Sequence, residues 1–218
     1  MFYHTKITGI KETEKGTELL ISIPGKGVKE EILRNRNKKG LLTAELIVDD
    51  NRSPSSEQIA KFYATIGDIA KHTGHAPEFI EMYIKYMFCK EKGLETVSMS
   101  KKKGTMSLAR ELITYLIEFC FREDIPTLDT LRNRNDDINA YLYLCLKYRK
   151  CAICNKKGQM HHWQAIGMGN NSKKIDDSDH EKMCLCEDHH LFAKDAVHRM
   201  GKKSFEDKYH IYGIKYKE

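Results

Sequence analysis

Two kinds of hydrophobic pattern divide the first half of the chain. Near the N-terminus, β-branched and alternating apolar residues predict strands, and they cover residues 2–10, 17–23 and 41–48. The turn between the first strands and the third contains Pro24 and Gly25, and residues 26–39 are so highly charged that we expect a short exposed helix there.

A helical period follows from residue 55 onward. Ser55 and Gln58 have the spacing of a capping box, in which each side chain satisfies a backbone amide of the first turn. Apolar residues then recur on one face as far as Ala70. A second helix is predicted from Pro77 to the stop at Gly93, a third from near residue 107, and a short one over residues 136–148. We interpret these apolar stripes as core.

The same pattern suggests how the chain is organised. Residues 123–135 contain Pro126 and several charges and read as a linker. We therefore expect an α+β protein with an N-terminal strand-and-helix domain over residues 1–125, a linker and connecting helix over 126–149, and a C-terminal module over 150–218.

Composition limits the class of protein. The chain has 218 residues, of which 40% are hydrophobic and 31% charged, as in a soluble globular protein. No apolar run has the length of a membrane span, and the N-terminus lacks the apolar stretch of a signal peptide. We expect no membrane partner and a cytoplasmic location.

The net charge of +6 is unevenly distributed. Basic residues cluster, and such clusters suit the phosphate backbone of a nucleic acid. We expect the strongest candidates for DNA contact to be Lys101, Lys102, Lys103, Lys173 and Lys174.

Four of the seven cysteines lie where histidines are also dense. Cys151 and Cys154 form one Cys-x-x-Cys pair, and Cys186 and His189 form a Cys-x-x-His pair about thirty residues later. Two such pairs are typical of a structural zinc site with tetrahedral ligands. Cys184 competes with Cys186 as the third sulfur ligand. The other cysteines, Cys89, Cys120 and Cys145, sit singly in apolar patterns and are expected in the core.

Adjacent histidines lie between the two ligand pairs. His161 and His162 fall in a short strand-like run, and side chains of successive strand residues point to opposite faces. The two imidazoles therefore cannot ordinarily have the same function. If one binds a metal, its neighbour reaches the same phosphate only through a distorted or bulged backbone. His190 and His198 follow the second ligand pair.

The order Cys-x-x-Cys, His-His, Cys-x-x-His-His resembles the HNH nucleases. Residues 151–212, with Gly167-Met168-Gly169-Asn170 and Lys208-Tyr209-His210-Ile211-Tyr212-Gly213, are similar to HNH nucleases of phages of Gram-positive bacteria. This resemblance implies a zinc-stapled, treble-clef-like ββα-metal module that cuts DNA in the cytoplasm of an infected bacterial host.

A second resemblance concerns the N-terminal half. Asn51-Arg52-Ser53, Glu57-Gln58 and Gly67-Asp68-Ile69-Ala70 resemble the NinB (Orf-like) recombination mediators. It implies a domain that binds single-stranded DNA or a single-stranded DNA-binding protein (SSB), and hence a role in phage recombination or replication.

The HNH resemblance also implies roles for single residues. His161 and His190 would bind a catalytic divalent metal, and His162 would be the general base. Lys194 occupies the place of the usual third ligand, so His198 becomes the candidate, as though one helical turn had been inserted. The middle Asn of the motif has no direct counterpart. His180 is nearest, with Glu181 beside it, and Asn170 and Asn171 are weaker candidates.

The identity of the catalytic metal stays open at this point. An all-imidazole site favours Mn²⁺, Ni²⁺ or Zn²⁺ over Mg²⁺, which prefers oxygen ligands. The main alternative is a non-catalytic, zinc-containing recombination mediator. A zinc-dependent nucleobase deaminase is excluded because the sequence lacks its His-x-Glu and Pro-Cys-x-x-Cys motifs. The long gap between ligand pairs argues against a zinc-finger transcription factor.

Overall fold

The computed structural model describes residues 5–37, 40, 42, 52–163 and 180–217. It combines helices with two small antiparallel sheets, so the α+β class is confirmed. Most of the strand predicted over residues 41–48 lies outside the described residues, as do Lys173, Lys174, Asn170 and Asn171.

The first sheet is a hairpin of β1 (Lys6–Thr13) and β2 (Gly16–Ser22), which agrees with the predicted strands. The register shifts once, between Ile7 and Gly9. No residue of either strand is buried. The charged segment that follows forms α1 (Val28–Leu33), also without a buried residue.

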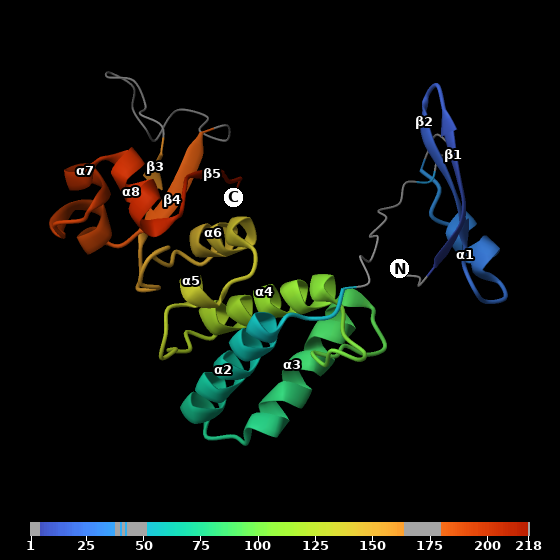
Figure 1. Cartoon of the computed structure of the whole chain (residues 1–218), viewed down its shortest axis with the longest axis horizontal. Coiled ribbons are helices and arrows are strands. Elements are labelled where there is room, and N and C mark those ends of the chain that lie inside the picture. The colour runs from blue at the N-terminus through green and yellow to red at the C-terminus, as the bar shows by residue number, and fades with distance from the viewer. Residues whose placement is uncertain (1–4, 38–39, 41, 43–51, 164–179, 218) are drawn as a thin grey trace.

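Three long helices pack together next in the chain (Figure 1). The capping box predicted for the first is present, because Gln58 N donates to Ser55 Oγ at 3.0 Å and Ser55 N donates to Gln58 Oε1 at 2.9 Å. Glycines in the left-handed region, Gly74 and Gly93, end the first two helices. The helices are α2 (Ser56–Thr73), α3 (Pro77–Lys92) and α4 (Met106–Arg122).

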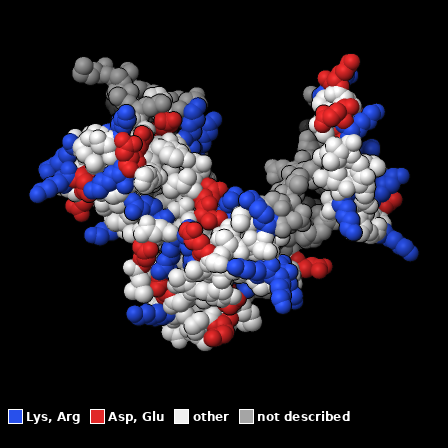
Figure 2. Space-filling model, in the orientation of Figure 1, with Lys and Arg blue, Asp and Glu red and all other residues white. Residues whose placement is uncertain are grey.

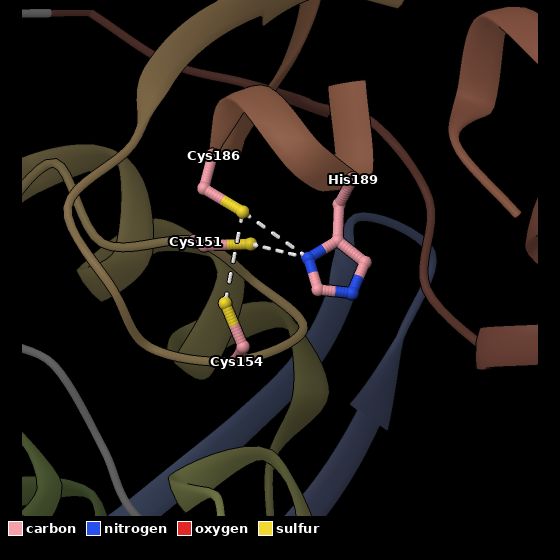
Figure 3. Close-up of side chains that lie close together, drawn as sticks. All are labelled: Cys151, Cys154, Cys186 and His189. Carbon is pink, nitrogen blue, oxygen red and sulfur yellow. Dashed lines mark hydrogen bonds between the residues drawn. The ribbon is translucent and has the colours of Figure 1, made fainter. Parts of the chain in front are cut away.

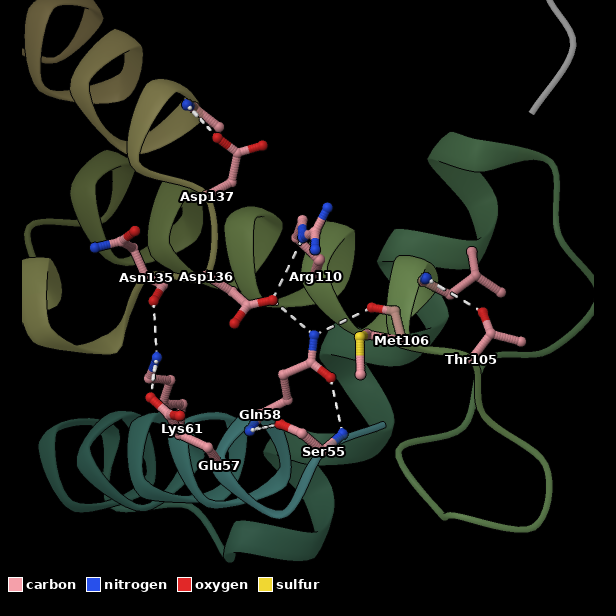
Figure 4. Close-up of polar contacts among 12 residues, drawn as sticks. Ser55, Glu57, Gln58, Lys61, Thr105, Met106, Arg110, Asn135, Asp136 and Asp137 are labelled. Carbon is pink, nitrogen blue, oxygen red and sulfur yellow. Dashed lines mark hydrogen bonds and ion pairs between the residues drawn. The ribbon is translucent and has the colours of Figure 1, made fainter. Parts of the chain in front are cut away.

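A buried amide connects the start of the bundle to the following segment (Figure 4). Gln58 Nε2 donates to Met106 O at 3.1 Å and to Asp136 Oδ2 at 2.6 Å. Asp136 also lies 3.5 Å from Arg110 Nε. Since an unpaired buried amide is costly, these bonds fix how α2, α4 and residue 136 lie together.

The segment predicted as a linker packs closely onto the helices. It contains α5 (Leu131–Arg134), and the buried Arg134 guanidinium pairs with Asp68 Oδ2 of α2 at 2.7 Å. The next helix, α6 (Ile138–Lys147), contacts both α4 and the second sheet. One hydrophobic cluster extends from Phe62 of α2 to Tyr216. The boundaries 1–125, 126–149 and 150–218 stay a prediction.

The second sheet has the order β3-β4-β5, with antiparallel pairs throughout. Short helical segments follow β4 and return the chain to β5, which pairs with β4. The return requires Gly213, where a Cβ atom would lie 2.4 Å from Trp163 Cβ. The elements are β3 (Gln159–His162), β4 (Glu181–Leu185), a π-helix η1 (Asp188–Phe192), α7 (Val197–Met200), α8 (Lys202–Tyr209) and β5 (Ile214–Lys215).

None of the helices in the described ranges is long and apolar enough to cross a lipid bilayer.

Candidate metal centres

Three sulfurs and one imidazole converge beside the second sheet (Figure 3). Cys151 and Cys154 come from the turn after α6, Cys186 follows β4, and His189 lies in η1. Cys154 Sγ is 3.7 Å from Cys186 Sγ. The Nδ1 atom of His189 is 3.6 Å from Cys151 Sγ and 3.2 Å from Cys186 Sγ.

These distances fit a tetrahedral zinc ion. Sulfurs bound at about 2.3 Å in a tetrahedron lie about 3.8 Å apart, close to the 3.7 Å between Cys154 and Cys186. The hydrogen bond from the Cys151 thiol, helped by His189, lowers the pKa of Cys154, and the same hydrogen bond together with burial raises the pKa of Cys151. Because a metal binds the thiolate form, Cys154 is the sulfur best prepared to bind a cation, and Cys151 releases its proton when the cation binds.

Cys184, the competing ligand, lies elsewhere. Its sulfur packs against Gly158, where an added Cβ atom would come within 2.8 Å of it. Burial raises the pKa of Cys184 to about 12, as expected for an inert core thiol. The structure therefore brings Cys186 into the four-residue cluster and leaves Cys184 out of it.

Asn155 organises the turn that carries the first two cysteines, and sequence reasoning missed it. Its backbone has φ 59°, and its N–H donates to Cys151 O at 2.9 Å. Its side chain accepts from Leu131 N at 2.7 Å and donates to the Tyr141 hydroxyl at 2.7 Å. An Asn directly after Cys-x-x-Cys was the available signal, because Asn tolerates the left-handed region better than most residues.

A second cluster consists of three imidazoles. His161 lies one residue before the end of β3, His190 directly follows His189 of the first cluster in η1, and His198 lies in α7. One ring nitrogen from each lies within 4.8 Å of the others. The Nε2 atoms of His190 and His198 are 3.1 Å apart, and the three ring centroids are separated by 4.7, 4.8 and 5.0 Å.

The electrostatics of this cluster suit neutral imidazole ligands. Burial, followed by the charges of His190 and His198, lowers the pKa of His161 to about 4. Burial and His198 also lower the pKa of His190. The buried Nε2 atom of His161 has no hydrogen-bond partner among the described residues. Nitrogens bound at about 2.1 Å lie about 3.0 to 3.4 Å apart, which brackets the 3.1 Å separation.

A break in the helical path brings His198 into the cluster. The expected extra turn after His190 does not continue the helix, since η1 ends at Phe192 and Ala193 is extended. Asp195 connects the non-helical segment 193–196 to α8, because its carboxylate accepts hydrogen bonds from Lys208 Nζ and Tyr209 Oη, each at 2.5 Å. The chain re-enters a helix at Val197, so two histidines eight residues apart become neighbours.

His162 and His180 are outside the group of three imidazoles. The β3–β4 register is regular, with His161 opposite Met183 and His162 opposite Lys182, so the two adjacent histidines belong to opposite faces. His180 precedes Lys182 by two residues, which puts it on the His162 face if the alternation continues. Its buried Nδ1 atom has no hydrogen-bond partner within the described ranges.

The first three lysines predicted to contact DNA are exposed. Lys101, Lys102 and Lys103 lie between α3 and α4, and Lys101 Nζ donates to Ser56 Oγ at 2.9 Å. Lys202, a clustered basic residue that was not among the strongest candidates for DNA contact, donates to Trp163 O and helps to lower the pKa of His161. Figure 2 shows Lys and Arg spread over the visible face with acidic side chains between them.

Comparison with known families identifies the chain's relatives. A family described as "Putative HNHc nuclease" matches residues 27–218, which include every helix of the described ranges and both clusters but not β1 and β2. Comparisons with curated proteins and with solved structures give no match.

Proposed function

The chain belongs to this family of HNHc nucleases, and from that premise we propose that it is a metal-dependent endonuclease that hydrolyses phosphodiester bonds in DNA. The observation that carries the proposal is the convergence of His161, His190 and His198 on one point. Partly exposed imidazoles that face one another are more useful as metal ligands than as packing residues.

The two clusters are assigned different ions. Cys151, Cys154, Cys186 and His189 bind structural Zn²⁺, which complements their three sulfurs and one nitrogen. His161, His190 and His198 bind the catalytic cation, which is Mn²⁺, Ni²⁺, Zn²⁺ or Mg²⁺. When bound, that cation supplies Lewis-acid stabilisation of the charge that develops on the phosphate oxygens. The β3–β4 hairpin followed by η1 supports a ββα-metal arrangement.

Proton transfer is assigned to the other face of β3. His162 takes the proton of the attacking water as general base, and His180 orients its imidazole. The positions of both residues support these roles, since His162 directly follows His161 at the end of β3 and His180 lies one residue before β4, the strand that pairs with β3. The charge of His162 already acts on His161.

Substrate positioning is assigned to lysines. Lys202 beside His161 and Trp163 is suited to hold a phosphate next to the imidazoles. Lys101, Lys102 and Lys103 are assigned to the DNA backbone, as are Lys173 and Lys174, which lie outside the described residues. Replacing any one of these lysines by alanine should change the slope of the logarithm of DNA affinity against the logarithm of salt concentration by about one unit, toward a weaker dependence.

The test of this function is plasmid cleavage by the purified full chain. We expect nicking or cutting with added Mn²⁺ or Mg²⁺ and none with chelator, with activity restored when metal is returned. His162→Ala should lose cleavage by roughly a hundredfold or more while it keeps its zinc and its melting temperature. Exposed His72→Ala on α2 is the matched control and should cleave normally.

Two outcomes separate this proposal from its alternative. Full cleavage by His162→Ala would refute the assigned base without touching the metal assignment. No cleavage of single-stranded, duplex, flapped or branched DNA with any of the four cations, together with tight single-stranded DNA binding, would favour the non-catalytic mediator. A role in phage recombination and an SSB partner stay predictions from the sequence resemblance.

A further inference from the structure

Helix α3 is apolar on two opposite faces. One face is core, where Ile80, Ile84 and Phe88 are buried. The other presents large side chains to solvent, with exposed fractions of 46% for Phe79, 62% for Met82, 40% for Tyr83 and 62% for Tyr86. A helix with apolar side chains all round normally buries both faces, so the outer face of α3 indicates an interaction surface.

The outer face has an ordered arrangement. Glu78, Met82, Tyr86 and Lys90 are each four residues apart and all exposed, and they form a single ridge along the helix; we call these four residues the α3 ridge. Beside it, Phe79 and Tyr83 stack at 6.4 Å with an interplanar angle of 19°. Tyr83 in turn meets Phe119 of α4 edge-on at 6.3 Å, so the rings beside the ridge are held in place.

The charges of the ridge argue for a particular partner. Glu78 stands at one end and Lys90 at the other, and neither has an ion pair among the residues that the structure describes. Their charges cancel, so the ridge has no net attraction for a polyanion such as DNA. A ridge with one acidic end and one basic end is instead complementary in charge to a second copy of itself that runs in the opposite direction.

We propose that α3 is a homodimer interface in which two copies of the chain pair their α3 ridges antiparallel about a two-fold axis. The axis crosses the ridge between Met82 and Tyr86, which is its midpoint. Residues equally distant from that midpoint then meet, so Glu78 contacts the Lys90 of the second copy and Met82 contacts its Tyr86. Each contact occurs twice, as in any isologous interface. A parallel pairing would place Glu78 against Glu78 and is disfavoured.

The size of the surface sets the strength of the dimer. The four exposed apolar side chains offer on the order of 400 Å², against about 800 Å² per partner in a standard stable interface. The dimer is therefore a reversible one, with dissociation in roughly the micromolar range.

Charge reversal tests the pairing directly. Sedimentation velocity of the full chain over a concentration series should show a monomer–dimer equilibrium. Glu78→Lys alone and Lys90→Glu alone should each weaken it by roughly tenfold, because each turns two attractive contacts into repulsive ones. The double variant E78K/K90E should recover wild-type dimerisation. An equimolar mixture of the two single variants should form a heterodimer, since every contact between them is again attractive.

The controls separate this interface from other causes. Glu91→Lys introduces the same charge change at an exposed position off the ridge and should dimerise like wild type. Circular dichroism should show all variants folded, because the substituted side chains are outside the core. A chain that stays monomeric at hundreds of micromolar overturns the proposal. So does a dimer that none of the single variants weakens, or a mixture of single variants that fails to associate.

Discussion

The two ligand clusters are neighbours in the chain and opposites in chemistry. His189 belongs to the first and His190 to the second, both within η1, and β4 leads directly to Cys186. The first cluster has three sulfurs and one nitrogen and is mostly buried, with Cys151 and Cys186 among the core residues. The second has nitrogens only, and His198 is exposed.

On the proposed assignment, the difference teaches how one short segment provides both stability and reactivity. Four protein ligands close a tetrahedron and leave no position for water, as in structural zinc sites. Three imidazoles leave positions open, as in catalytic sites. Since consecutive residues belong to the two clusters, an ion that fixes His189 also fixes the backbone from which His190 projects. We therefore expect loss of the ion at the first cluster to disrupt the second cluster, and loss of the ion at the second cluster to leave the first intact.

Cys154→Ala should have the largest effect. Structural zinc binding contributes folding free energy directly, on the order of 10 kcal/mol in small zinc modules. We expect the segment after α6 to lose its zinc and its fixed structure, and the histidine cluster to disappear with it. Zinc content by mass spectrometry and near-ultraviolet circular dichroism measure both effects.

Cys184→Ala is the matched control for that variant. It removes a buried sulfur that is outside the cluster, so it should cost only what a small cavity usually costs and keep its zinc. If Cys154→Ala contained as much zinc as wild type and had the same melting temperature, the first cluster would not be a structural zinc site and the comparison between the two clusters would have no basis.

His161→Ala tests the opposite direction and should leave the fold intact. It removes one of three imidazoles, so we expect binding of the second cation and DNA cleavage to fall by roughly a hundredfold or more. The four-residue cluster is complete without it, so one zinc per chain should remain. Calorimetric titration of Mn²⁺ into the zinc-loaded protein gives a readout that does not depend on cleavage. Loss of zinc from this variant would mean that the dependence between clusters runs both ways.

Features that depend on local sequence could be predicted. The capping box at Ser55, the proline start and glycine stop of α3 and the paired Cys-x-x-Cys and Cys-x-x-His motifs each act over a few residues, and the structure contains all of them. For the same reason, strand alternation predicted that His161 and His162 differ in environment, and the regular β3 register agrees.

Features that depend on distant contacts could not be predicted. Nothing near Cys184 reveals that Gly158 lies against its sulfur, which is why the choice between Cys184 and Cys186 stayed open. Phe79 and Tyr83 continue the apolar pattern of α3 and are predicted as core with it, yet both are exposed. The segment 123–135 looked like a linker since the partner of Arg134, Asp68, is far away in the sequence.

Lowering the pH should destabilise the folded chain through His161, one of the three clustered imidazoles. In the folded chain without a cation at the histidine cluster, the pKa of His161 is about 4, against 6.5 ordinarily. The unfolded chain therefore takes up a proton first as the pH falls below 6.5, and stability is lost between about pH 6.5 and 4. Because the ring is only partly buried, we expect a loss of about 1 to 2 kcal/mol.

His161→Gln isolates that contribution from protonation of the zinc ligands. Urea unfolding of both proteins at pH 7.5 and 5.0, with zinc present and the second cation removed, gives two differences in the free energy of unfolding. Wild type should lose more stability than the variant over this interval. An equal loss in both proteins would show that the burial of His161 does not oppose its protonation.

Asp195→Asn should have the smallest effect, and it tests what distinguishes the second cluster most, its dependence on a break in the helical path. The carboxylate receives bonds from Lys208 and Tyr209 that hold residues 193–196 against α8, and the charge of the ion pair with Lys208 is lost in the amide. The Lys208 bond, then that of Tyr209, lowers the pKa of Asp195 to about 2, so the tie is intact throughout the neutral range. Without it, His198 is less firmly oriented toward His190, and affinity for Mn²⁺ should fall by roughly three- to tenfold while zinc content is unchanged.

Asp207→Asn is the control, because it removes an exposed carboxylate from α8, and it should bind Mn²⁺ like wild type. If Asp195→Asn also binds like wild type, packing of Val197 alone fixes α7, and the position of the third imidazole depends on the core and not on the ion pair.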